Sequence, residues 1–188
     1  MILDRTKPRK IVVLMFAAAV FLTQHIGSLA KAESAGGLRW DSPSEWTHRG
    51  STRMRVATYI IPSIAGDSED GECVVYFFGP GQGGSVPANL RRWLGQFRTP
   101  DGGPVDQLAR TDKLRVGEIE VTRLEVNGTY LFKPTPFAPK AVPKPGYRMF
   151  AAIAQGPVGP VFFKLTAPDK TARSAKDAFE SMLQSLTR

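Results

Sequence analysis

The hydrophobic positions along the chain change their period several times, and each period predicts an element. Residues 53–61 are rich in β-forming side chains, and residues 72–78 are apolar at consecutive positions, which is typical of a central strand covered on both faces. Apolar residues recur at helical spacing after residue 85 and again over 171–186. The pattern therefore predicts strands, a helix near the middle and a second helix at the C-terminus.

The central helix has a clear start. Ser85 is a suitable N-cap, and Pro87 falls in the first turn, where a missing N–H costs little. Asn89 falls outside the apolar stripe, whose members are Val86, Leu90, Trp93, Leu94 and Phe97. We expect this stripe to pack on a sheet.

Further strands are predicted over 113–116 and 119–130. In the longer one, Ile119 and Val121 share a parity that Leu124 and Val126 do not, so we expect a bulge or a sharp twist near Thr122 and Arg123. Residues 147–155 and 161–166 form the clearest hairpin. This order, with strands and helices segregated, predicts an α+β fold in which helices pack on an antiparallel sheet.

Residues 133–146 break the pattern with five prolines and three lysines. Such a segment cannot be a helix or an interior strand, and we predict a long loop. Extended proline-rich backbone loses little entropy on binding, and its lysines favour an anionic partner. The candidate binding residues here are Lys133, Phe137, Lys140, Lys144 and Tyr147; the alternative is a loop without function.

Several motifs resemble a known architecture. Pro43 and Trp46 form a Pro-x-x-Trp entry, residues 162–166 read FFKLT, and Phe179 precedes a Ser-Leu pair at 185–186 in the last helix. Over roughly 40–186 these features resemble the PsbP-like α-β-α sandwich, and the YFFGPGQGG and FFKLT stretches resemble those of uncharacterised bacterial exported proteins. The resemblance implies a non-catalytic accessory or interaction role and brings no active-site residues.

The N-terminus is typical of a secretory signal peptide over 1–30. Four basic residues precede twelve apolar ones at 11–22, and small residues end at Ala30. The alternative, a membrane anchor, needs roughly 20 apolar residues. Cleavage there lowers the net charge from +8 to +5, because four basic residues and one acidic residue leave. We therefore predict a periplasmic or extracellular protein with a polar leader over 31–38, a single α+β domain over 39–188 and no transmembrane span after cleavage.

The glycine-rich stretch at 79–84 fits the spacing G-x-G-x-x-G. A dinucleotide site also needs a parallel strand after the helix and an acidic residue about 20 positions on. Here a Gly/Pro loop follows the helix, and Asp101 and Asp106 do not lie at the end of a predicted strand. Prolines at positions 80 and 87 remove backbone donors as well. The remaining alternatives are a structural turn and an anion-binding loop made by Gly81, Gly83, Gly84 and Ser85.

Composition limits the chemistry. No run of five Lys or Arg occurs, so we expect no nucleic-acid partner. After cleavage His48 is the single histidine and Cys73 the single cysteine, so we expect no cofactor, no metal site and no catalytic residue. The acidic stretch 67–72 misses the calcium-loop spacing.

Three function classes follow. We favour an exported, non-catalytic binding or accessory protein for an anionic envelope component or a protein partner. The first alternative is a hydrolase with a carboxylate pair from 67–72 and 101–112, which would need to face each other across a pocket. The second is a structural protein without a ligand, and the oligomeric state stays open.

Overall fold

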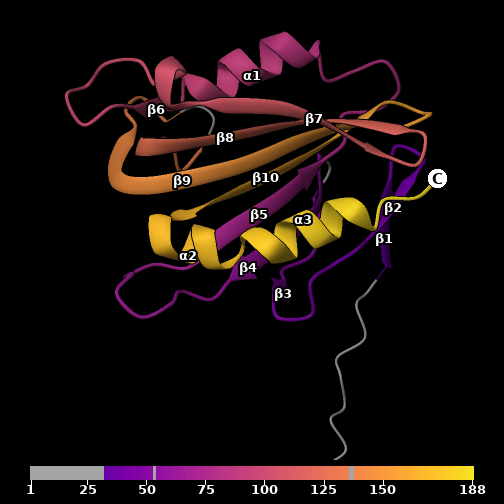
Figure 1. Cartoon of the computed structure of the whole chain (residues 1–188), viewed down its shortest axis with the longest axis horizontal. Coiled ribbons are helices and arrows are strands. Elements are labelled where there is room, and N and C mark those ends of the chain that lie inside the picture. The colour runs from indigo at the N-terminus through magenta and orange to yellow at the C-terminus, as the bar shows by residue number, and fades with distance from the viewer. Residues whose placement is uncertain (1–31, 53, 136–137) are drawn as a thin grey trace, which may run out of the picture.

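One eight-stranded antiparallel sheet organises the residues that the computed structural model describes, which are 32–52, 54–135 and 138–188 (Figure 1). The predicted signal peptide and Phe137 lie outside these ranges. The strands in spatial order are β3 (Thr47–His48), β4 (Arg55–Ile61), β5 (Gly71–Tyr76), β10 (Pro160–Pro168), β9 (Val142–Gln155), β8 (Ile119–Phe132) and β6 (Phe97–Arg98), with β7 (Arg110–Val116) also paired to β8.

Helices cover both faces of this sheet (Figure 1). Helix α1 (Val86–Leu94) lies on one face, and α2 (Asp169–Ser174) and α3 (Lys176–Gln184) lie on the other, where the predicted last helix is divided at Ala175. The layers confirm the α+β class that we predicted, with helices on an antiparallel sheet.

A two-stranded hairpin precedes the sheet. It consists of β1 (Ala32–Ala35) and β2 (Leu38–Asp41). Residues 32–38 of the predicted polar leader therefore form β1, the turn after it and the start of β2, and Leu38 is fully buried in the core. Sequence patterning missed this because a four-residue strand has too few positions to show a period.

Strand alternation divides the core into two clusters, one under each helical layer. In β10, Phe163 and Leu165 point to the α2–α3 face, whereas Phe162 points to the α1 face and meets the edge of Trp93 at 6.3 Å between ring centroids. An aromatic pair of this kind adds about 0.5–1.5 kcal/mol beyond the buried area. Helix α1 is thus anchored to the sheet through Trp93.

Of the two alternatives that we expected near Thr122 and Arg123, the bulge is absent from the described pairing, and that alternative is wrong. Strands β7 and β8 pair without a shift from Ile119 to Glu125, and the irregularity lies between Gly128 and Tyr130. Apolar residues of both parities occur because both faces are covered: Val121 packs on the α2–α3 side and Leu124 on the α1 side.

Helix α1 begins as predicted, with the Ser85 hydroxyl accepting a hydrogen bond from the Ala88 N–H. Asn89, however, is buried and not on the outer surface. Its side-chain amide donates to the carbonyls of Gly83 at 2.7 Å and Ser85 at 3.0 Å. A polar residue on the inner side of the helix therefore fixes the glycine-rich turn that leads into it.

The β9–β10 hairpin is present as predicted, but the proline-rich segment before it is not wholly a loop. Strand β9 already begins at Val142 and pairs with the end of β8, with Pro143 opposite Leu131. Strand β10 reaches only to Tyr147, so this part of β9 is paired on one side. Prolines are tolerated here because the missing N–H groups belong to an edge.

Candidate binding trough

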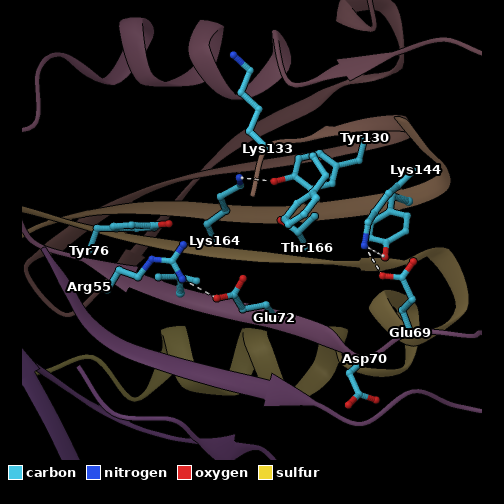
Figure 2. A pocket seen from close by; sticks show the side chains of 13 residues that line it. Arg55, Glu69, Asp70, Glu72, Tyr76, Tyr130, Lys133, Lys144, Lys164 and Thr166 are labelled. Carbon is cyan, nitrogen blue, oxygen red and sulfur yellow. Dashed lines mark hydrogen bonds and ion pairs between the residues drawn. The ribbon is translucent and has the colours of Figure 1, made fainter. Parts of the chain in front are cut away.

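Two adjoining cavities lie on the α1 face of the sheet, and we call them together the trough. The polar chamber, of about 160 Å³, is bordered by β4, β5, β10 and the far end of the β8–β9 hairpin (Figure 2). The aromatic chamber, of about 310 Å³, lies between the sheet and α1. The residues that line both chambers are Arg55, Tyr76 and Lys164.

The register of the sheet builds the floor of the trough. Strand β10 places Phe163 and Leu165 in the core of the opposite face, so Lys164 must point to the α1 face. There it stands between Val74 of β5 and Ala151 of β9. Alternation alone thus places a charged side chain in the middle of a mostly apolar sheet.

Lys164 is partly buried and bonds to polar groups without a full charge. Its Nζ donates to Oε1 of Gln96 at 2.6 Å and makes a longer contact of 3.5 Å to the hydroxyl of Tyr130. It also lies 5.3 Å from the centre of the Tyr130 ring, within cation–π range. Within the described residues, Lys164 forms no ion pair with a carboxylate.

The pKa of Lys164 is lowered to about 8, mainly by burial and in smaller part by the positive charges of Arg92 and Arg55, while Glu72 opposes the shift. Burial therefore removes hydration that would stabilise the protonated amine. An anion entering the trough would restore an opposite charge beside it.

One end of the polar chamber is held by Arg55 and Glu72. The Nη1 of Arg55 donates to Oε1 of Glu72 at 2.7 Å, and its guanidinium lies 5.8 Å from the centre of the Tyr76 ring. Burial raises the pKa of Tyr76, so its hydroxyl stays protonated. This pair fixes the boundary between the two chambers.

The other end is held by Lys144, which bonds to Glu69 and, at 3.4 Å, to the hydroxyl of Tyr147 (Figure 2). Its Nζ also lies 4.8 Å from the centre of the Phe132 ring. Burial alone would lower the pKa of Lys144, but the hydrogen bond to Glu69 and the neighbouring Tyr147 outweigh it, and the pKa is raised. The hydrogen bond from Lys144 lowers the pKa of Glu69 in turn.

The structure brings together three of the five residues predicted in the proline-rich segment. Lys133, Lys144 and Tyr147 line the polar chamber. Lys140 is exposed and lines neither chamber, and Phe137 lies outside the described residues.

The predicted glycine-rich residues do not join them, because Gly81, Gly83, Gly84 and Ser85 line neither chamber. A Cβ added to Gly83 would lie 2.7 Å from the Phe162 ring, and the backbone there has φ +100°, which disfavours any other residue. The turn therefore allows the chain to pass close to the sheet on its way into α1.

Several trough residues escaped the sequence analysis, and the clearest are Arg55, Tyr76, Tyr130 and Lys164. One signal was present: Lys164 is the only charged residue among the nine of β10. A charge within a strand that reads as apolar on both faces indicates a functional or paired position. Arg55 and Tyr130 carried no such signal, because each lies near a strand end.

Among the residues described, the two acidic stretches of the hydrolase alternative, 67–72 and 101–112, do not meet in one pocket. Glu69, Asp70 and Glu72 line the polar chamber, whereas Asp101 and Asp106 are exposed. Asp112 is on the α2–α3 face, bonded to Arg123. No cluster that could hold a metal ion occurs in the described ranges.

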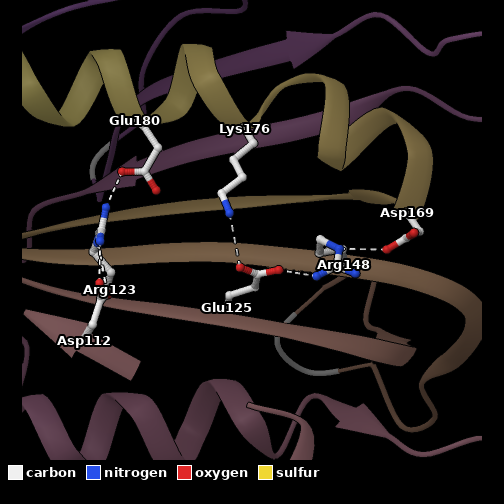
Figure 3. A network of polar contacts seen from close by, with 7 residues as sticks. All are labelled: Asp112, Arg123, Glu125, Arg148, Asp169, Lys176 and Glu180. Carbon is white, nitrogen blue, oxygen red and sulfur yellow. Dashed lines mark hydrogen bonds and ion pairs between the residues drawn. The ribbon is translucent and has the colours of Figure 1, made fainter. Parts of the chain in front are cut away.

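The opposite face carries a network of ion pairs between the sheet and the C-terminal helices (Figure 3). Arg148 bonds to Glu125 and, through Nε at 2.7 Å, to Asp169, and its side chain is only 8% exposed. Lys176 approaches Glu125 to 3.6 Å. Arg123 joins Asp112 of β7 to Glu180 of α3. This network holds α2 and α3 on the sheet.

Comparison with known proteins gives structural likenesses only. No family model and no curated protein matches the chain. CyanoP, the PsbP of Synechocystis sp. PCC 6803, is 10% identical over 93% of this chain and 98% of its own, with a TM-score of 0.49. PA94 of Pseudomonas aeruginosa, of unknown function, is 7% identical over 85% and 97%, with a TM-score of 0.49.

LpqN of Mycobacterium tuberculosis, which is involved in cell envelope biogenesis, is 14% identical over 80% of this chain and 82% of its own, with a TM-score of 0.43. Among the described residues, no helix has the length and apolar character that crossing a bilayer requires.

Proposed function

We propose that the protein is exported and acts without catalysis, holding an anionic component of the cell envelope in the trough. The observation that carries this proposal is Lys164, a partly buried ammonium group whose described partners are an amide and a phenol. A cation withdrawn from water and left without a counter-charge costs free energy. An anionic ligand would recover that cost.

The surrounding charges favour the same ligand. Arg92 borders the aromatic chamber and, within the described part of the chain, bonds to the neutral side chain of Asn89. Lys133 stands at the edge of the polar chamber. Arg92 and Lys133 thus have no carboxylate partner among the described residues, and each lines one of the two chambers that Lys164 also lines. Together the three positive charges attract an anion from solution.

The carboxylates of the polar chamber favour binding over acid–base catalysis. Glu72 is bonded to Arg55, Glu69 to Lys144, and Asp70 accepts from the backbone N–H of Ser63. The lowered pKa of Glu69 stabilises its ionised form. General acid catalysis needs a carboxyl group whose pKa is raised, so Glu69 is suited to hold Lys144 in place and not to donate a proton.

Export is tested by the form of the protein that a Gram-negative host produces from the full-length gene. We expect it in the periplasmic or extracellular fraction, with a mass that corresponds to cleavage after Ala30. An uncleaved protein in the cytoplasmic fraction would contradict this part of the proposal and leave the trough unaffected.

Binding is tested by co-sedimentation of the purified protein with isolated cell envelopes at increasing NaCl concentration. We expect a bound fraction that falls with salt, since screening weakens the attraction. Lys164→Gln should weaken retention about tenfold and Lys133→Gln about twofold, because the first charge is desolvated and the second is exposed.

Lys140→Gln is the matched control for both variants. It removes the same charge from an exposed lysine that lines neither chamber. Retention that is equal in all three variants and the parent protein would mean that the trough does not hold the envelope component, and the proposal would fail.

A further inference from the structure

The aromatic chamber contains more than an anion alone requires. Its apolar lining consists of Met54, Tyr76, Phe78, Trp93 and Phe162, and three cations border it, Arg55, Arg92 and Lys164. None of its lining residues is a carboxylate. A site for a small inorganic anion would need the cations without this apolar surface.

The aromatic rings form a fixed wall. Phe78 stacks on Tyr76 with ring planes 9° apart and centroids 5.9 Å apart. Phe162 meets Phe78 edge-on at 5.4 Å, and Trp93 packs against Phe162 from the helix. Trp93 and Phe162 are buried beneath the chamber, which leaves Phe78 and Tyr76 partly exposed to it. Preformed apolar walls of this kind are typical of small-molecule sites.

Met54 completes the apolar surface at the mouth. Its side chain is 56% exposed, although it borders a cavity whose other apolar members are mostly covered. A ligand body in the chamber would remove this surface, and that of Phe78, from water. The volume of about 310 Å³ corresponds to the small end of ligand pockets.

We propose that the ligand of the trough is an organic anion with a flat aromatic body. The anionic head lies against Lys164 and Arg92, and the body packs on Phe78 and Tyr76 in the aromatic chamber. This assignment rests on the proposed function and narrows it from an anionic component to a chemical class. The apolar walls exclude water around the head, which strengthens its attraction to the two cations.

The test uses four probes that separate the head from the body. 2-Naphthoate carries both, acetate carries the head alone, 2-naphthylmethanol carries the ring without the charge, and decanoate carries the head on a flexible chain. Each is titrated into the purified protein and followed by calorimetry and by the ¹³C methyl resonance of Met54. Met182, a buried residue of α3 on the opposite face, serves as the internal reference.

We expect 2-naphthoate to bind at least about tenfold more tightly than acetate, which lacks the aromatic ring, and than 2-naphthylmethanol, which lacks the negative charge. The Met54 resonance should shift with 2-naphthoate while that of Met182 stays fixed. Decanoate should bind more weakly than 2-naphthoate, since ordering a flexible chain costs entropy that a rigid ring does not.

Arg92→Gln should weaken 2-naphthoate binding about tenfold, the loss of one charged hydrogen bond. Arg91→Gln is the matched control, because Arg91 is the preceding residue on the same helix, is exposed, and does not line the chamber. The affinity of Arg91→Gln for 2-naphthoate should stay within about twofold of that of the parent protein.

The other outcomes separate this inference from the proposed function. Acetate binding as tightly as 2-naphthoate would overturn the aromatic body while the anion site stands. Decanoate binding as tightly would overturn the flat aromatic class. 2-Naphthylmethanol binding as tightly as 2-naphthoate would overturn the anionic head and with it the proposed function, and so would the absence of binding by every probe.

Discussion

On the α2–α3 face Arg148 is held between two carboxylates, whereas on the α1 face Lys164 is held between an amide and a phenol. Both side chains leave a strand of the same sheet, β9 and β10 respectively, and both lie beneath a helix (Figures 2 and 3). Position in the sheet therefore does not explain why only one of them has opposite charges beside it.

We attribute the difference between the partners of Arg148 and those of Lys164 to different roles of the two faces. A buried charge with complete partners is fixed in place and contributes to one arrangement of the helices. A buried charge whose partners are neutral has no opposite charge beside it, and an anionic ligand can supply one. We interpret the first arrangement as structural and the second as the binding surface, and the two can be separated by substitution.

The largest effect is expected from Arg148→Met, which removes the centre of the structural network. Glu125 and Asp169 would each retain one other cation, Lys176 and Arg173, so we expect a loss of about 2–3 kcal/mol in the free energy of unfolding, somewhat less than for a pair left wholly uncompensated. Urea denaturation measures it, and envelope binding should not change in the folded variant.

Arg173→Met provides the control for that prediction. Arg173 bonds to Asp169 as well, but its side chain is 65% exposed, so its removal should cost about 0–0.5 kcal/mol. If the two variants lose the same stability, burial of the network does not distinguish the faces and the structural interpretation is wrong.

A smaller effect of opposite sign is expected from Lys164→Met. Because burial makes the protonated amine unfavourable, the variant should be more stable than the parent at pH 7, by about 1 kcal/mol, while losing envelope binding. In the parent the folded pKa is about 8 and the ordinary lysine value is 10.5. Between these values the unfolded chain holds the extra proton, so stability of the parent rises with pH.

The advantage of Lys164→Met should therefore shrink from pH 8 to pH 10.5, as measured by urea denaturation at pH 7, 9 and 10.5. Lys113→Met is the comparison, because Lys113 is exposed on β7 and bonds to Glu120 at the surface. A parent protein that is more stable than Lys164→Met at pH 7 would show that the amine is satisfied where it lies.

The fold was predictable where the signals were local. Ser85 and Pro87 marked the start of α1, and the β9–β10 hairpin followed from two apolar runs and the turn between them. The local sequence did not decide whether β8 has a bulge near Thr122. Whether a change of parity means a bulge or a strand with two buried faces depends on the helices that cover it, and these come from distant parts of the sequence.

The trough was predictable only in part. Lys133, Lys144 and Tyr147 were found because a run of prolines and lysines is visible as composition. Arg55 and Lys164 lie 109 positions apart and meet because β5 separates β4 from β10 by one strand, so their proximity is a property of the sheet order. Composition does not encode strand order, and the aromatic chamber could not be foreseen.

The smallest expected effect is the uptake of a fraction of one proton by Lys164, the amine that distinguishes the two faces, when a ligand binds. An anion beside Lys164 should raise its pKa, so at pH 8.5 binding of 2-naphthoate should take up part of a proton from the buffer. Calorimetry in two buffers of different ionisation enthalpy measures this uptake. Affinity should also fall as the pH rises above about 8, because the unliganded amine loses its charge.

Arg92→Gln should retain the proton uptake at reduced affinity, since Lys164, the group expected to take up the proton, is unchanged in that variant. Lys164→Gln should abolish the uptake. Uptake that persists in Lys164→Gln would show that a group other than Lys164 takes up the proton when the anion binds. A site centred on Lys164 should instead lose both the uptake and the fall in affinity above about pH 8 when that amine is removed.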